Sequence, residues 1–271
     1  MGRIWLVTGA SRGLGREIAR AALHAGETVV ATARSEQAVR NVIGDENDRL
    51  HAVALDITDG EAATAVAAEI SHTVGAIDVL VNNAGYAELG FFETFTEDAV
   101  RRQFEVNLFG TMNVTRAVAP FMRERRSGLI ITISSVSGLV SSAGGSVYSA
   151  SKFAVEGWME GLAEELAPLG VRSLLVEPGM LRTEFMDTRS AGFGSIAIPD
   201  YAEAVAQYRA FIDAANGHQP GDPAVLAHRI VSLASLDDAP LRFVFGEDAR
   251  QWVGAKLGQL QQQLAGSAAD D

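Results

Sequence analysis

The sequence predicts an α/β protein, a single domain of residues 1–271 built on a doubly wound parallel sheet of seven strands with helices on both faces. Three observations predict this class. Short apolar runs alternate with longer amphipathic stretches, which indicates right-handed β–α crossovers. Several of the runs are almost continuous Val, Ile and Leu, as is typical of parallel strands covered on both faces. No linker divides the chain before its Ala-, Gly- and Asp-rich end after Leu264.

The elements follow from these runs in chain order. The apolar runs predict strands at Ile4–Val7, Thr28–Ala33, Leu50–Leu55, Asp78–Val81, Leu129–Ile133, Arg172–Val176 and Leu241–Phe245. The amphipathic stretches predict helices at Leu14–Ala25, Gln37–Ile43, Gly60–Val74, Glu97–Glu124 with an internal break, Val147–Pro168 and Asp222–Leu236. Residues Thr183–Pro220 interrupt the repetition and are interpreted as an insertion, and a C-terminal tail is expected after about residue 247.

Composition excludes several classes of function. Hydrophobic residues make up 48% and charged residues 21%, which suits a globular protein with a buried core. The net charge of −12 argues against nucleic acid as a partner. The chain has no cysteine, and its five histidines are scattered, so no metal site is expected. A strand that starts at Ile4 leaves no room for a signal peptide, and no apolar run is long enough for a membrane span, so the expected location is cytoplasmic.

A glycine-rich loop follows the first strand and opens the first helix, with the sequence TGASRGLG from Thr8 to Gly15. Glycines permit close approach of a pyrophosphate to the backbone, and the helix N-terminus supplies free amides. The strand–loop–helix context therefore predicts a Rossmann-type nucleotide site. Its spacing is G-x-x-x-G-x-G rather than the commoner G-x-G-x-x-G. The residues expected to bind the cofactor here are Gly9, Ser11, Arg12, Gly13, Leu14 and Gly15.

Tyr148 and Lys152 stand four positions apart in a stretch of small residues, Ser141–Gly157. On a helix these positions share a face, so the phenol and the ammonium would be neighbours. An adjacent ammonium favours the phenolate of a tyrosine, which would suit an acid–base role. A core tyrosine beside a lysine with a buried stem is the structural alternative, and the pair alone leaves both interpretations open.

Together the motifs resemble the short-chain dehydrogenase/reductase family. The resemblance rests on the glycine spacing, on Asn82-Asn83-Ala84-Gly85, Asn107, Ser135 and Tyr148-x-x-x-Lys152, and on Pro178-Gly179 followed by Thr183. These motifs occur in the family's order over about two-thirds of the chain. The C-terminal third, with Gly221-Asp222-Pro223 and Pro240-Leu241-Arg242-Phe243, is similar to hydroxysteroid and retinol dehydrogenase-like members.

The resemblance implies a catalytic role for four residues. Tyr148 would be the general acid and base, and Lys152 would promote its ionisation and hold the nicotinamide ribose. Ser135 lies 13 residues before Tyr148, as in the family, and would hydrogen-bond the substrate oxygen. Asn107 would hold a water that links Lys152 to solvent. The alternatives are a strand-end turn for Ser135 and a polar core residue for Asn107.

The resemblance also implies cofactor contacts beyond the loop. Asp56 would accept from the adenine amino group, and Thr183 would reach the nicotinamide carboxamide. Besides these two, the expected cofactor-binding residues after the loop are Arg34, Ile57, Asn83, Ala84, Gly85, Tyr148, Lys152, Pro178 and Gly179. The alternatives are a helix-flanking cap for Asp56 and an ordinary turn for Asn83–Gly85.

The end of the second strand predicts a preference for NADP(H) over NAD(H). An NAD site usually has an acidic residue there, whereas this chain has Ala33 followed by Arg34. Arg12 would bring a second guanidinium to the same corner, and guanidinium groups match phosphate geometry. The alternative is that Arg34 simply lies on the surface and that Arg12 caps the loop.

The sequence thus predicts an oxidoreductase that interconverts a bulky hydrophobic ketone and its secondary alcohol. The insertion Thr183–Pro220 would form a lid over an apolar pocket, facing Tyr86, Leu89, Phe91 and Phe92. The alternatives are simple packing of the insertion onto the domain, a silent cofactor-binding regulator, or an epimerase or dehydratase of the same superfamily. The resemblance further implies a homodimer or homotetramer. The net charge and the lack of a long apolar run predict no nucleic-acid or membrane partner.

Overall fold

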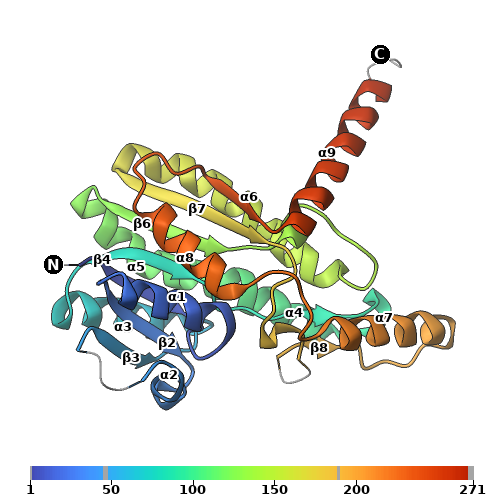
Figure 1. Cartoon of the computed structure of the whole chain (residues 1–271), viewed down its shortest axis with the longest axis horizontal. Helices are drawn as coiled ribbons and strands as arrows, with labels where there is room; N and C mark the ends of the chain where they lie inside the picture. Colours follow the sequence, from blue (N-terminus) through green and yellow to red (C-terminus); the bar gives the residue numbers. More distant parts are fainter. Residues whose placement is uncertain (1, 45–47, 188–189, 268–271) are drawn as a thin grey trace.

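The computed structural model describes residues 2–44, 48–187 and 190–267, and its centre is a parallel sheet of seven strands (Figure 1). The strand order is β3-β2-β1-β4-β6-β7-β9. The strands are β1 (Ile4–Thr8), β2 (Thr28–Ala33), β3 (Leu50–Ala54), β4 (Ile77–Asn82), β6 (Gly128–Ile133), β7 (Val171–Pro178) and β9 (Arg242–Phe245). The predicted fold class and all seven predicted strands are confirmed, with ends shifted by only one or two residues.

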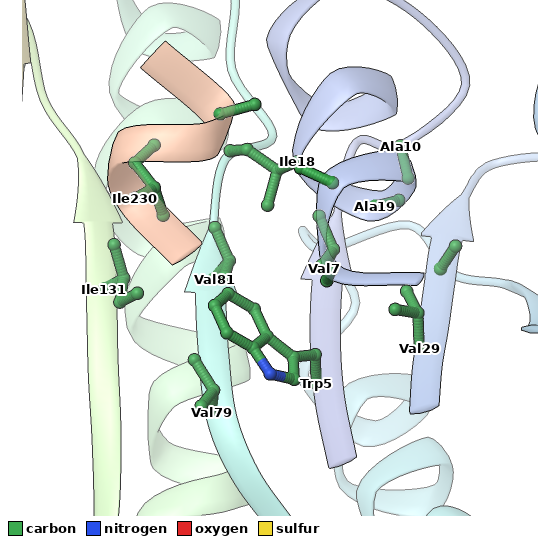
Figure 2. Close-up of a cluster of buried hydrophobic side chains, with 14 of the residues drawn as sticks. Trp5, Val7, Ala10, Ile18, Ala19, Val29, Val79, Val81, Ile131 and Ile230 are labelled. Atoms are coloured by element: carbon green, nitrogen blue, oxygen red, sulfur yellow. The ribbon is translucent and has the colours of Figure 1, made fainter. Parts of the chain in front are cut away.

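Helices cover both faces of the sheet. One face carries α1 (Gly13–His24) and α8 (Pro223–Ala234), and the other carries α3 (Gly60–Thr73), α5 (Thr111–Arg125) and α6 (Ser146–Leu166). Successive side chains of a strand point to opposite faces of the sheet, so the hydrophobic core has one part on each face. Trp5 and Val7 pack with Ile18 and Ile230 on the first face, as Figure 2 shows. Leu6, between them in β1, packs on the second face.

The strand order reverses between β1 and β4, the point where the chain switches from one half of the sheet to the other. In open parallel sheets a crevice forms at such a switch point, at the carboxyl ends of the strands. The loops that follow β1, β2, β3, β4, β6 and β7 all begin at this edge. The predicted motifs lie in or beside these loops, so the sheet topology brings them together at this one edge.

Three regions differ from the predicted elements. The predicted insertion contains a helix, α7 (Ala202–Ala215), and the expected tail contains another, α9 (Glu247–Ser267), which projects away from the sheet in Figure 1. A short parallel pair, β5 (Glu88–Leu89) and β8 (Gly192–Phe193), ties the insertion to the segment after β4. Residues 188–189 of the insertion and 268–271 of the tail lie outside the described residues.

The predicted break in the long helix is a π-helical turn, Glu105–Gly110, between α4 (Glu97–Phe104) and α5. The remaining helix is α2 (Glu36–Ile43). Among the described helices, none is long and apolar enough to cross a membrane. Over the same residues, no group of three His, Cys, Asp or Glu side chains is placed to hold a metal ion.

Candidate active site

A cavity of about 930 Å³ opens at the carboxyl edge of the sheet. It brings together nearly every site residue predicted from the sequence. The predicted residues that line it are Gly9, Ser11, Arg12, Gly13, Leu14, Arg34, Asp56, Ile57, Asn83, Ala84, Gly85, Ser135, Tyr148, Lys152, Pro178, Gly179 and Thr183. Gly15 and Asn107 do not line the cavity, and both lie behind its wall.

Asn83 holds the glycine loop in place. Its side-chain nitrogen donates to the carbonyl oxygens of Thr8 (2.9 Å) and Gly9 (3.3 Å), and Thr8 Oγ1 accepts from the backbone of Asn83 and Ala84. Gly9 has φ of +68°, which favours glycine. A Cβ on Gly15 would come within 2.4 Å of the Asn83 side-chain nitrogen. Gly15 therefore packs against the loop and Asn83, and its contact with the cofactor stays a prediction.

The first turn of α1 faces the cavity without a side-chain cap. Arg12 is the residue before the helix, and its side chain accepts no hydrogen bond from the backbone nitrogens of the first turn. By contrast, α2 and α3 are capped by Ser35 and Asp59. Free amides and a positive helix end favour an anion at this position. The loop therefore fits the pyrophosphate of a dinucleotide.

Ser135, Tyr148 and Lys152 meet on the wall of the cavity, and all three are buried. Ser135 Oγ accepts from the backbone nitrogen of Ser137 at 3.0 Å, in a 3₁₀ turn that follows β6. Lys152 Nζ donates to the carbonyl oxygen of Ile133 at 2.8 Å, which fixes the ammonium at the end of the same strand. The Tyr148 ring lies against Phe185, with 5.8 Å between ring centroids.

Burial shifts the pKa of both titratable members of this set. It raises the pKa of Tyr148 to about 12, and hydrogen bonding with Ser135 opposes the rise. It lowers the pKa of Lys152 to about 8, and the charge of Glu156 opposes the fall. Burial thus dominates the pKa of Tyr148, and the expected promotion of its ionisation by Lys152 stays a prediction. Tyr148 holds its proton at neutral pH and can donate it to a bound carbonyl.

Asn107 lies in the π-helical turn and is buried behind the site. Its Oδ1 accepts from the backbone nitrogen of Tyr86 at 3.1 Å, and its Nδ2 donates to the Tyr86 carbonyl (3.0 Å) and to Ser151 Oγ (3.2 Å). The side chain therefore joins the segment after β4 to α6. This matches the alternative of a polar core residue, while the water-holding role stays a prediction.

Asp56 and the two predicted arginines lie at the opposite end of the cavity. Asp56 Oδ1 accepts from the nitrogen (3.0 Å) and hydroxyl (2.8 Å) of Thr58, and these bonds, with Arg34 and Arg102, keep the pKa of Asp56 below its ordinary value. Arg12 and Arg34 are exposed, and within the described part of the chain neither forms a salt bridge. Both guanidinium groups are therefore available to an anionic ligand.

Sequence reasoning missed several residues that line this cavity, among them two with large side chains. Arg102 lines it from α4, and Trp252 lines it from α9. Arg101, the neighbour of Arg102, also lines the cavity and pairs with Glu97 at 2.7 Å. Trp252 belongs to the region that was expected to be a tail. Neither residue carried a sequence signal beyond its type.

An apolar wall completes the cavity on the side of Tyr148. Its larger side chains come from the segment after β4 and from the insertion: Tyr86, Leu89, Phe185, Met186, Tyr208, Phe211 and Ile212. Two aromatic residues predicted to face the lid, Phe91 and Phe92, do not line this wall. Phe91 packs instead on Tyr201 (5.4 Å) and Tyr208 (6.3 Å), and Phe92 is exposed.

Comparisons with known proteins agree with this geometry. A family model described as short chain dehydrogenase matches residues 3–192. "Oxidoreductase BOA17" of Botryotinia fuckeliana is 34% identical over 255 residues, which cover 94% of this chain and 92% of that protein. A short-chain dehydrogenase crystal structure from Streptomyces avermitilis is 43% identical, with a TM-score of 0.90 and full coverage of both chains. A metagenomic short-chain oxidoreductase in complex with NADP is 30% identical, with a TM-score of 0.70, and the match covers 90% of this chain and 96% of that one.

Proposed function

Because this chain belongs to the short-chain dehydrogenase/reductase family, and is therefore an NAD(P)-dependent oxidoreductase, we propose a finer assignment of its activity. The protein uses NADP(H) to interconvert a bulky hydrophobic ketone and its secondary alcohol. Tyr148 is the general acid and base. The observation that carries this proposal is the meeting of Ser135, Tyr148 and Lys152 between an uncapped glycine loop and an apolar wall in one cavity.

The chemistry follows from the positions of these side chains. The reduced nicotinamide, when bound, supplies a hydride to the carbonyl carbon. Ser135 hydrogen-bonds the carbonyl oxygen, where negative charge develops. Tyr148 gives its phenolic proton to that oxygen, so a C–H and an O–H bond form and an alcohol results. Lys152 places a positive charge beside the phenolate that remains, which favours the proton transfer.

The cofactor preference rests on the corner formed by Ala33, Arg34 and Arg12. Ala33 and both arginines line the cavity, and the side chain at position 33 carries no charge that would repel a 2′-phosphate. Arg34 and Arg12 would supply charge-assisted hydrogen bonds to that phosphate. The 30% identical relative with bound NADP supports the same reading.

The substrate class rests on the apolar wall. The insertion contributes Phe185, Met186, Tyr208, Phe211 and Ile212 to it, beside the Tyr148 ring. An aryl, polyketide-like or steroid-like ketone would bury apolar surface there, whereas these wall side chains offer no charge to a small charged acid. We propose that the insertion acts as a lid over this bound substrate.

Turnover of a ketone and alcohol panel, followed through the absorbance of the reduced nicotinamide, tests the assignment. We expect bulky hydrophobic ketones to have the highest kcat/KM. Faster turnover of short polar or charged ketones would refute the substrate class. Cofactor binding without turnover of any panel member would favour the silent regulator instead. The family further suggests a homodimer or homotetramer, which analytical ultracentrifugation tests.

A further inference from the structure

A buried ion-pair cluster lies on α6, directly behind the site. Lys152, Glu156 and Glu160 follow one another at four-residue intervals, so they lie along one face of this helix. Arg242, from the outer strand β9, binds both glutamates of this row and also Glu177 of β7. The cluster therefore joins the helix that carries Tyr148 and Lys152 to an outer strand some 80 residues later in the chain.

The members of the cluster differ sharply in burial. Glu177 Oε1 lies 2.9 Å from Arg242 Nη1 and its side chain is fully buried, while the side chain of Glu156, bound to the same nitrogen, is 5% exposed. Glu160 accepts from Arg242 at 3.0 Å but is 62% exposed. Of the three carboxylates, only Glu156 is both buried and one helical turn from Lys152, so solvent screens its charge at Lys152 only weakly.

Glu156 also supports the turn that carries Ser135. A Cβ on Gly138, in that turn, would come within 2.8 Å of both Glu156 Cγ and Ser134 Oγ. The Glu156 side chain thus packs directly against Gly138, the last residue of the 3₁₀ turn that follows Ser135. Glu156 thus lies between Lys152 and the turn that follows Ser135, and it does not line the cavity.

The cluster holds more buried negative charge than Arg242 neutralises. Glu156 Oε1 and Glu177 Oε2 are buried, and neither has a hydrogen-bond partner among the described residues. Burial and the charge of Glu156 raise the pKa of Glu177 to about 7, so one carboxyl is partly protonated near neutral pH. Arg242 binds the Glu156 carboxylate, and the charge of Glu156 raises the pKa of Lys152, which lies one helical turn away.

We propose that Glu156 is a positioning residue that keeps Lys152 in its ammonium form, while Arg242 and Glu177 fix the Glu156 carboxylate. The charged groups around Lys152 are Glu156, with Glu160 further along α6, Glu177 from β7 and Arg242 from β9. The neighbouring Tyr148 is neutral, and the Ile133 carbonyl of β6 accepts from Nζ. That the ammonium charge of Lys152 matters for turnover rests on the proposed function. The effect of Glu156 on that charge does not rest on it.

The sequence makes a direct measurement practicable, because it contains only two lysines, Lys152 and Lys256. In a Lys256→Arg background, Lys152 gives the only lysine side-chain signal in a protein labelled with ¹³C-lysine. Titration of its Cε resonance then yields the ionisation constant of Lys152 without any assay of activity. Glu156→Gln removes the buried charge at nearly constant volume, and Glu160→Gln removes the exposed partner of Arg242 as a matched control.

We expect Glu156→Gln to increase the acid ionisation constant of Lys152 by about three- to tenfold, which lowers its pKa. Glu156→Asp should restore most of the wild-type value, and Glu160→Gln should leave it unchanged. The basic limb of the kcat/KM profile should move to lower pH in Glu156→Gln only. An unchanged ionisation constant in folded Glu156→Gln would overturn the proposal.

Three further results decide the remaining cases. If Glu156→Gln does not fold, the wild-type titration still tests the proposal, since Lys152 found neutral at pH 7 would contradict it. A shifted ionisation constant in a protein that reduces no ketone would leave this inference standing and refute the proposed function. If wild type reduces the ketone and the ionisation constant of Lys152 is unchanged in Glu156→Gln, this inference is refuted and the proposed function stands.

Discussion

Removal of Arg34 tests the cofactor preference, and the structure sets the size of the effect. Arg12 and Arg34 are both exposed, so each charge-assisted bond to a 2′-phosphate should contribute near the lower limit of about 1.5 kcal/mol. Two such bonds give about 3 kcal/mol, or roughly a 100-fold preference for NADP(H). Arg34→Ala should lower that preference about tenfold by removing one of the two donors.

The double variant Ala33→Asp/Arg34→Ala should go further and favour NAD(H), because a carboxylate there repels the phosphate and can bond the ribose hydroxyls. The assay is kcat/KM with both cofactors on one substrate. Arg123→Ala, which removes the same charge from an exposed position of α5, is the control and should change nothing. Equal wild-type values for the two cofactors, or an Arg34→Ala variant with unchanged preference, would refute the reasoning.

Three other variants test the site and the cluster behind it. Tyr148→Phe should lower kcat by ~100- to 10,000-fold with cofactor affinity nearly unchanged, as measured by turnover and by fluorescence titration. Phe211→Ala should raise KM for a bulky ketone by about tenfold or more through lost apolar contact, while Phe92→Ala, outside the cavity, should not. Glu177→Gln should flatten the pH dependence of stability. The folded-state pKa of Glu177 is raised from 4.5 to about 7. In wild type, the free energy of unfolding should therefore fall by up to about 3 kcal/mol as the pH rises from 4.5 to 7. Urea unfolding at several pH values will measure this fall.

The sheet could be predicted because its strands are buried on both faces and are therefore continuously apolar. The two helices that were not predicted bury very little. In α7 only Ile212 is buried, and in α9 only Ala249, so neither shows the apolar periodicity that indicates a helix against a core. Glycines at positions 254 and 258 weaken the helical signal of α9 further.

The candidate site shows a similar division. Its loops could be predicted because each motif follows a strand, and parallel strands bring their carboxyl ends to one edge. The pKa of Tyr148 could not be predicted, because it depends on burial and on the hydrogen bond with Ser135. The contact of Arg242 with Glu156 joins residues 86 positions apart, and no local pattern marks either partner.

Transfer of deuterium from the reduced cofactor tests the central claim most directly. NADPH carrying deuterium at the transferable C4 position is mixed with wild-type protein and a bulky hydrophobic ketone, and the alcohol is analysed by mass spectrometry and NMR. We predict one deuterium on the carbinol carbon with wild type, and almost none in the same time with Tyr148→Phe, although that variant still binds NADPH. An alcohol without deuterium, or equal rates of deuterium transfer by the two proteins, would contradict hydride transfer assisted by the Tyr148 proton.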